Sequence, residues 1–162
     1  MTNPASLYQE VILEHNKKPR NYGLLPDADH RAEGVNPLCG DHITLNLQLE
    51  GDRIGKIGFE GESCAICKAS SSMMTTNVKG KTTDEVEQLI REFREMATGQ
   101  LDPAGPHHLG RLTVFSGIAG LPSRVKCAVL PWHTLQAALH SGGTATTEGT
   151  DDPAPGSEGP AG

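Results

Sequence analysis

Hydrophobic and polar residues alternate strictly over residues 43–50, ITLNLQLE, and this pattern predicts a half-buried β-strand. The apolar face of this strand consists of Ile43, Leu45, Leu47 and Leu49. After a turn at residues 51–52, the segment 53–61, RIGKIGFEG, returns as a second strand whose glycines indicate a β-bulge. The two segments together predict an antiparallel hairpin.

Helical patterns lie on both sides of this hairpin. Residues 3–16 predict an amphipathic helix that Asn3 can cap. A polar stretch rich in turn formers, residues 17–34, predicts a loop that leads toward the hairpin. After the hairpin, Ser63 can cap a helix of small residues over residues 64–79.

The second half of the chain predicts three more helical segments. Thr82 and Glu85 have the spacing of a capping box at the start of an amphipathic helix. Residues 107–120 predict a short helix with a glycine-rich exit. Ser123 can cap a last helix, which Pro131 should bend or interrupt.

Length and charge limit the class of protein. The 162 residues suffice for one domain with one core, which we expect over residues 1–140, and residues 141–162 predict a disordered acidic tail. This tail supplies four of the six net negative charges, so the body has little net charge and nucleic acid is not an expected partner. The sequence contains no apolar run of the length of a signal peptide or membrane span, which predicts a cytoplasmic protein without membrane contact.

Four cysteines in a reducing compartment are more typical of metal ligands or redox thiols than of structural disulfides. Cys39 lies in the loop before the first predicted strand, and Cys64 and Cys127 lie in the first turns of predicted helices. A helix N-terminus stabilises a thiolate, and Arg124 and Lys126 add positive charge beside Cys127.

Cys39, Asp41, Cys64 and Cys127 provide four ligands, the number that a tetrahedral zinc ion or an iron–sulfur unit requires. The three cysteines are separated by 25 and 63 residues, so the spacing matches no short metal motif. The alternative is that Cys64 and Cys127 are buried as small hydrophobic residues and that Cys39 belongs to an ordinary turn. The residues alone leave both interpretations open.

Four motifs favour the metal site: VILEHNKKPRNYG, PLCGD, CAICKASSSMMT and LPSRVKCA. In this order, over roughly residues 5–140, the chain resembles the SufU and IscU group of iron–sulfur cluster assembly proteins, which is related to the N-terminal domain of NifU. The resemblance implies an α+β fold of the IscU type, a small antiparallel sheet packed by helices with the metal site at one end. It places Cys39, Asp41, Cys64 and Cys127 on the metal-binding positions of the family.

Two departures from the scaffold branch of this group resemble the SufU branch. Lys126 stands where scaffolds have histidine, and the segment between the second and third family cysteines is longer. The resemblance implies a zinc-dependent sulfurtransferase in which Cys39 accepts persulfide sulfur from a SufS-type cysteine desulfurase. Arg124 and Lys126 would support the transferred group or be ordinary surface charges, and the recipient would be a downstream SUF scaffold or an apo iron–sulfur protein.

Two other functions remain as alternatives. On the same four ligands, the protein can be a scaffold on which a [2Fe–2S] cluster is assembled and then transferred. It can also be a zinc-stabilised binding module without transfer chemistry.

The remaining residues with metal or thiol chemistry have simpler interpretations. Cys67 is expected to be a packed neighbour of Cys64, with a resolving thiol as the alternative. His42 is expected to point away from the apolar face, and His107 and His108 are expected to face solvent.

Overall fold

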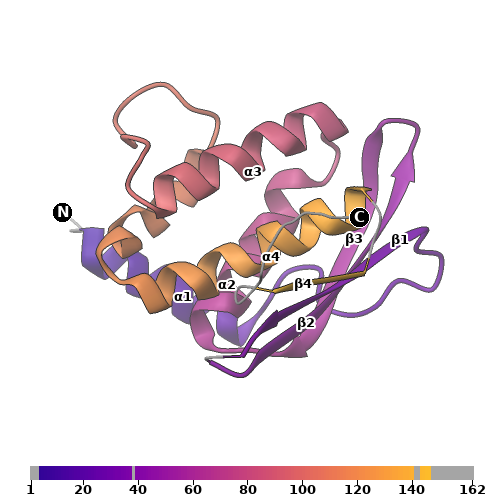
Figure 1. Cartoon of the computed structure of the whole chain (residues 1–162), viewed down its shortest axis with the longest axis horizontal. Coiled ribbons are helices and arrows are strands. Elements are labelled where there is room, and N and C mark those ends of the chain that lie inside the picture. The colour runs from indigo at the N-terminus through magenta and orange to yellow at the C-terminus, as the bar shows by residue number, and fades with distance from the viewer. Residues whose placement is uncertain (1–3, 38, 141–142, 147–162) are drawn as a thin grey trace.

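The computed structural model describes residues 4–37, 39–140 and 143–146. Its sheet contains β1 (His30–Asn36), β2 (Asp41–Glu50), β3 (Arg53–Glu62) and β4 (Gly143–Thr146) in the order β3-β2-β1-β4 (Figure 1). The pairs β1–β2 and β2–β3 are antiparallel, and β4 pairs in parallel with β1. The predicted hairpin is therefore confirmed as β2 and β3.

The predicted bulge is also confirmed and lies on β3. Gln48 pairs with Lys56, whereas Leu49 pairs with Ile54, so Gly55 is the additional residue between the two pairs. The bulge keeps the apolar residues of both strands on the same face of the sheet.

Strand β1 was not expected, because its segment was assigned to a polar loop. The residues that β1 turns toward the helices are Ala32, Gly34 and Asn36, all buried, and they give no apolar alternation. A Cβ atom at Gly34 would lie 2.1 Å from Oγ1 of Thr134, so the helix over β1 packs directly against its backbone. This close packing requires small residues, and small residues conceal the strand pattern.

Strand β4 falls within the segment that composition assigned to a disordered tail. Residues 143–146 pair with residues 32–35 of β1, while the rest of that segment lies outside the described residues. Pairing at a sheet edge uses backbone groups, so this strand needs no apolar pattern.

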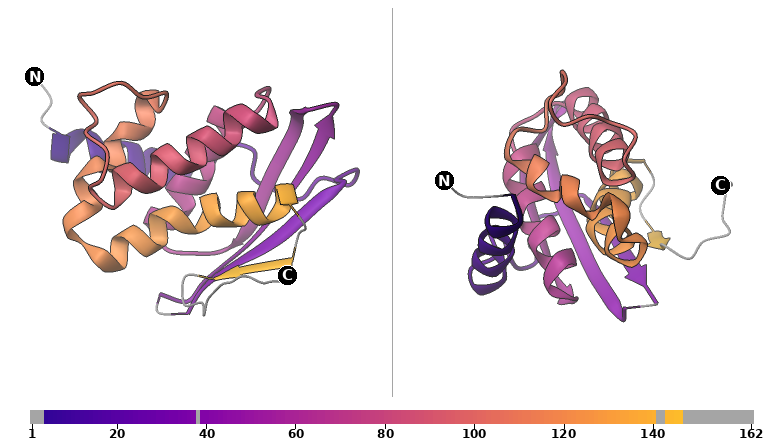
Figure 2. Two further views of the ribbon diagram at one scale, coloured as in Figure 1. Left: turned by 45° about the horizontal axis from the view of Figure 1, so that its top comes forward. Right: turned by 90° about the vertical axis from the view of Figure 1, so that its left-hand side faces the viewer.

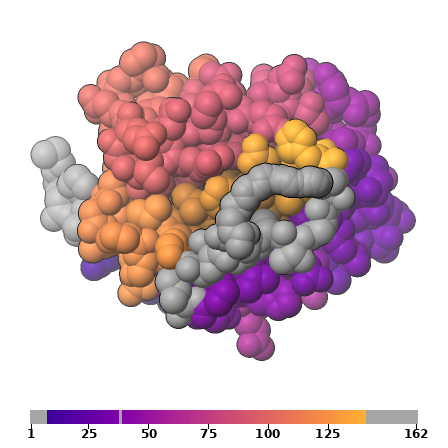
Figure 3. All heavy atoms as spheres, in the orientation of Figure 1, coloured from indigo at the N-terminus to yellow at the C-terminus, as the bar shows by residue number. Residues whose placement is uncertain are grey.

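The helices are α1 (Pro4–Lys17), α2 (Ala65–Val78), α3 (Thr83–Ala97) and α4 (Pro122–His140), with the 3₁₀ segment η1 (Gly110–Gly120) before α4. Helices α2 and α4 pack against the sheet, α1 packs on α2, and α3 packs on α4 (Figures 1 and 2). In the space-filling view, α3 and the chain after it form the upper side of the molecule (Figure 3). This arrangement confirms the α+β class.

Aromatic residues fill the core between α3, α4 and η1. The rings of Phe93 and Trp132 are stacked with centroids 4.6 Å apart, and Phe93 meets Phe115 edge to face at 5.6 Å. All three side chains are buried, so Trp132 belongs to the core.

The structure corrects two predicted helix starts and confirms one. The N-cap of α2 is Cys64 and not Ser63, whereas the capping box of Thr82 and Glu85 at α3 is confirmed. Helix α4 begins at Pro122 and continues through Pro131. Cys127 therefore lies in the second turn of α4, beyond the free N–H groups of the first.

Within the described part of the chain, no helix combines the length and apolar character needed to cross a membrane.

Candidate functional site

The predicted ligands meet at one end of the sheet, where the β1–β2 turn approaches the start of α2 and the second turn of α4 (Figure 1). Asn36 and Asp41 are paired residues at the base of this turn, and the backbone N–H of Cys39 donates to the carbonyl of Asn36 at 3.3 Å. Gly40 has φ of 72°, a left-handed conformation that favours glycine. Cys39 and Gly40 of the PLCGD motif thus lie in the turn between β1 and β2, with Cys39 exposed.

Asp41 is a buried carboxylate because it continues the alternation of Ile43 and Leu45 toward the helices. Its Oδ1 accepts a hydrogen bond from the backbone N–H of Cys64 at 2.7 Å. Its Oδ2 accepts one from the side-chain amide of Asn36 at 3.2 Å. These two donors offset the cost of burying the carboxylate.

The three thiols gather around this carboxylate. The Sγ atoms of Cys39 and Cys127 are 3.4 Å apart, and Sγ of Cys64 lies 3.9 Å from Oδ2 of Asp41. One ligand atom each of Cys39, Asp41 and Cys127 lies within 4.8 Å of the other two. Cys64 lies outside this group of three, although it is hydrogen-bonded to Cys127.

These positions fit a tetrahedral metal ion. Zinc bonds of about 2.3 Å place two thiolate ligands about 3.8 Å apart in a tetrahedron. The Cys39–Cys127 Sγ separation of 3.4 Å is close to that value. Sγ of Cys64 lies 3.9 Å from Oδ2 of Asp41 but outside the group of three, so Cys64 would have to shift to complete the tetrahedron. Three thiols and one carboxylate form a ligand set that suits zinc or iron.

Ionisation is uneven among the thiols. A hydrogen bond with Cys127, together with the backbone N–H of Cys67, lowers the pKa of Cys64 to about 7 against the opposing effect of burial. The same bond with Cys64, followed by burial, raises the pKa of Cys127. Cys64 is therefore the more readily ionised of this pair, whereas the sequence predicted a stabilised thiolate at both positions.

Cys67 contributes to the site through its backbone. Its side chain is fully buried, and burial raises the pKa of its thiol well above the usual value. A protonated, buried thiol is what the packed-neighbour interpretation expects.

The two predicted supporting charges lie before Cys127 on α4, with Arg124 exposed and Lys126 half-buried. Arg124 is close enough to Tyr8 of α1 to act on its ionisation, as are Cys64 and Cys127. Burial is the main reason that the pKa of Tyr8 is raised. Tyr8 therefore borders the site, a position that helical periodicity alone could not indicate.

Asn36 is the second residue of the site that sequence reasoning missed. Its side chain is fully buried, and Nδ2 lies 3.2 Å from Asp41 Oδ2 and 3.5 Å from Cys127 Sγ. The alternation that buries Asp41 would have identified Asn36 as its partner, had β1 been recognised as a strand.

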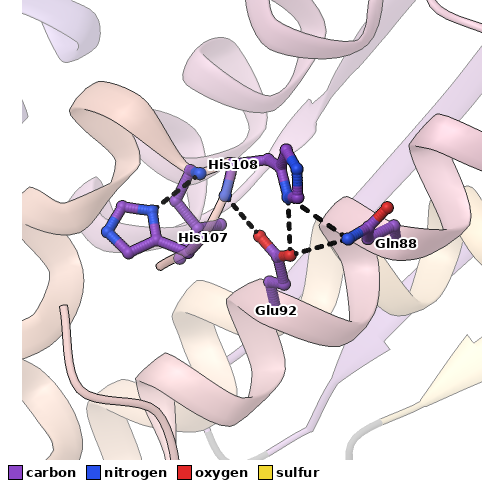
Figure 4. A network of polar contacts seen from close by, with 5 residues as sticks. Gln88, Glu92, His107 and His108 are labelled. Atoms are coloured by element: carbon purple, nitrogen blue, oxygen red, sulfur yellow. Dashed lines mark hydrogen bonds and ion pairs between the residues drawn. The ribbon is translucent and has the colours of Figure 1, made fainter. Parts of the chain in front are cut away.

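The histidines do not join the thiols. His42 is exposed on the opposite face, as expected, where Nε2 lies 3.0 Å from Glu33. His108 faces solvent, as expected, and His107 is half-buried. Both lie in the segment before η1, which is hydrogen-bonded to α3 (Figure 4). The Nδ1 atom of His108 lies 2.9 Å from Glu92 and 3.2 Å from Gln88, and His107 Nε2 contacts the Pro103 carbonyl.

The protein is thus a small α+β domain with three cysteines and an aspartate gathered at one end of its sheet. Residues 7–128 match the model of the NifU-like N terminal domain, and the chain belongs to this family. It is 41% identical over 133 residues to the iron-sulfur cluster assembly scaffold protein IscU of Streptococcus pyogenes serotype M1, covering 82% of each chain. It is 38% identical over 137 residues to the zinc-dependent sulfurtransferase SufU of Bacillus subtilis (strain 168), covering 85% of this chain and 92% of that protein.

Solved structures agree with this family. One is described as a putative iron-sulfur cluster assembly scaffold protein for the SUF system from Fervidobacterium islandicum AW-1. It superposes with a TM-score of 0.75 at 34% sequence identity, covering 82% of this chain and 96% of that chain. The resemblance inferred from the four motifs is confirmed at the level of the family.

Proposed function

We propose that this protein serves iron–sulfur cluster assembly as a zinc-dependent sulfurtransferase, with Cys39 as the acceptor of persulfide sulfur from a cysteine desulfurase of the SufS type. The observation that carries the proposal is the contrast in exposure within the cluster. Cys39 is exposed on a turn, whereas Asp41 and Cys127 are buried and Cys64 is half-buried. Only the first of these four can readily meet a sulfur atom on another protein.

Asp41, Cys64 and Cys127 would hold the zinc, with Cys39 as the fourth and releasable ligand. Bound zinc keeps its thiolate ligands deprotonated at neutral pH. The carboxylate of Asp41 is a harder ligand than a fourth thiolate, which favours exchange at this site. The name of the Bacillus subtilis relative supports zinc in particular.

The chemistry is a thiol–disulfide type of exchange. The Cys39 thiolate attacks the outer sulfur of the desulfurase persulfide, a new S–S bond forms on Cys39, and the old S–S bond breaks. The desulfurase cysteine leaves as a thiolate, so the transfer involves no net oxidation or reduction. Gly40 gives the turn the freedom to present Cys39, and the exposed guanidinium of Arg124 supplies positive charge near the cluster.

The test is sulfur transfer from a SufS-type desulfurase and cysteine to the zinc-loaded protein, followed by intact-protein mass spectrometry. The wild type and the Cys67→Ser control should each gain a sulfur atom, while Cys39→Ser should bind zinc and gain none. Sulfur arriving on Cys39→Ser would reject Cys39 as the acceptor.

The second candidate function is a scaffold that assembles a [2Fe–2S] cluster on the same four residues. It is favoured by the name of the Streptococcus pyogenes relative and by the three thiols of the ligand set. Metal analysis of anaerobically purified protein separates the candidates. Zinc with activation of the desulfurase supports the transferase, iron with a visible cluster supports the scaffold, and zinc without activation supports a binding module.

A further inference from the structure

We propose that Asn36 is a positioning residue that holds Asp41 in the orientation in which Oδ2 faces the thiols and can bind the metal. The inference rests on the metal site of the proposed function and adds a residue to it. Asn36 is fully buried at the end of β1, and Asp41 is 1% exposed directly opposite it on β2.

The side-chain amide of Asn36 is directed at the ligands. Its NH₂ group has two hydrogens, and Nδ2 lies within reach of two acceptors, Asp41 Oδ2 at 3.2 Å and Cys127 Sγ at 3.5 Å. A donor shared between a carboxylate and a thiol from different elements sets the position of one relative to the other.

The two oxygens of Asp41 are not equivalent. Oδ1 is 2.7 Å from the backbone N–H of Cys64, which belongs to the cap of α2 and cannot turn away. Oδ2 faces Sγ of Cys64 at 3.9 Å and Asn36 on its other side. The backbone bond holds the carboxylate through Oδ1, and the amide bond from Asn36 holds Oδ2 beside the thiols.

An outer hydrogen-bond partner of this kind orients the ligand, and its loss typically weakens metal binding 10- to 100-fold. Asn36→Leu keeps approximately the size of the side chain and removes both donors. Without them, the Asp41 carboxylate is held only through Oδ1, and Oδ2 loses the hydrogen bond that fixes its place beside the thiols.

The chain offers a matched control in Asn46, which is also fully buried and lies on β2. Its Oδ1 accepts from the backbone N–H of Leu25 at 2.7 Å, in a contact with the loop before β1. Asn46→Leu therefore removes a buried amide from the same sheet without touching the ligands.

The experiment measures zinc affinity by competition with a chromophoric chelator for the wild type, Asn36→Leu, Asp41→Ala, the double variant and Asn46→Leu. Asn36→Leu should bind zinc about 10- to 100-fold more weakly than the wild type, but its effect should shrink to less than about 3-fold when Asp41 is already alanine. Asn46→Leu should keep wild-type affinity. With cobalt in place of zinc, Asn36→Leu should change the d–d bands while the thiolate charge-transfer bands remain.

Equal losses in both Asp41 backgrounds would overturn the inference, because Asn36 would then act on the fold or through Cys127 and not through Asp41. An equal loss in Asn46→Leu would overturn it in the same way. If Asn36→Leu does not fold, Asn36→Ser enters the same cycle with the same criteria. A wild-type protein that binds neither metal through thiolates would reject the proposed zinc site together with this inference, whereas unchanged affinity in a folded Asn36 variant would reject the inference alone.

Discussion

The β1–β2 turn and the segment before η1 both gather side chains with metal-ligand chemistry, but they satisfy them in different ways. Beside η1, Glu92 accepts from the backbone N–H of His108 at 2.7 Å, and its other oxygen lies 2.9 Å from His108 Nδ1 and 3.1 Å from Gln88 Nε2 (Figure 4). The carboxylate has its donors within the protein. Its hydrogen bonds attach the segment before η1 to α3.

At the β1–β2 turn, the ligand atoms face one another. Cys39, Asp41 and Cys127 lie within 4.8 Å of each other, and the partners of Asp41 are two amide groups and not a cation. Groups that become anionic together at this distance repel one another, and a bound cation removes that repulsion. The two regions show that the presence of histidine or carboxylate does not by itself make a candidate metal site. What distinguishes the β1–β2 turn is that its ligand atoms point toward one another.

The largest expected effect is the loss of zinc affinity when a predicted ligand at the β1–β2 turn is removed. The matched variant in the segment before η1 serves as the control. Cys127→Ser should weaken zinc binding by at least about 100-fold, since losing a ligand costs more than losing an outer partner. His108→Ala should leave zinc affinity unchanged, because its contacts end on Glu92 and Gln88. Competition with a chromophoric chelator measures both.

A comparable loss of zinc in both variants would remove the distinction between the two regions. Thermal unfolding with and without a chelator tests whether zinc contributes to stability. A ligand at 100 times its Kd stabilises the folded state by about 2.7 kcal/mol. We expect the melting temperature to fall on chelation in the wild type and to be insensitive to chelation in Cys127→Ser.

Local features of the fold were easier to predict from the sequence than either of these two regions. The β2–β3 hairpin and the capping box at Thr82 were predictable because alternation and capping are local signals. The three cysteines among the predicted ligands lie far apart in the chain, and only the family motifs grouped them, since spacing left two interpretations open. The role of His108 was missed because its partner Glu92 lies on another element, 16 residues away.

What could not be predicted depends on close packing. Strand β1 has Ala32, Gly34 and Asn36 on its inner face because α4 lies directly on it, and this combination has no β-strand signature. Because β1 was not predicted, the pairing of Asn36 with Asp41 was not predicted either. The side-chain amide that contacts both Asp41 and Cys127 was therefore missed. The position of Tyr8 beside Cys64 and Cys127 depends on how α1 packs, which helical periodicity does not specify.

A second test concerns His133, which lies on the same helix as Cys127 and, among the residues that the structure describes, has no carboxylate partner like that of His108. Burial, followed by the positive charge of Arg94, lowers the pKa of His133 from 6.5 to about 4. The unfolded chain therefore binds this proton more readily than the folded protein does. The contribution of neutral His133 to stability should be fully present above pH 6.5 and should be lost as the pH falls toward 4. The loss is up to about 3 kcal/mol in the free energy of unfolding.

Urea unfolding at intervals between pH 7 and pH 4 measures this loss in the wild type and in His133→Leu. The variant should show a flatter profile over that window, with the remaining slope including His15, whose pKa burial also lowers. His42→Ala, which removes an exposed histidine, should keep the wild-type slope. A wild-type slope in His133→Leu would assign the pH dependence to other groups.

The smallest expected effect belongs to Glu92 and tests whether the segment before η1 is independent of the metal site. Burial alone would raise the pKa of Glu92, but hydrogen bonds from His108 and Gln88 lower it below its usual value. The ionised carboxylate thus contributes stability above the unfolded pKa of 4.5, and this contribution disappears as the pH falls through the folded pKa. Glu92→Gln should lower the free energy of unfolding by about 1 kcal/mol at pH 7 and by less near pH 3.

Glu87→Gln is the matched control for this prediction, because Glu87 also lies on α3 and meets a histidine, His140, whose side chain is 63% exposed. An exposed pair of this kind should contribute less than about 0.5 kcal/mol. Zinc affinity should be unchanged in both variants, since neither side chain contacts a predicted ligand. If Glu92→Gln weakened zinc binding, the segment before η1 would have to act on Cys127 through α3 and α4. Its histidines would then contribute to the function of the site as well as to the stability of the fold.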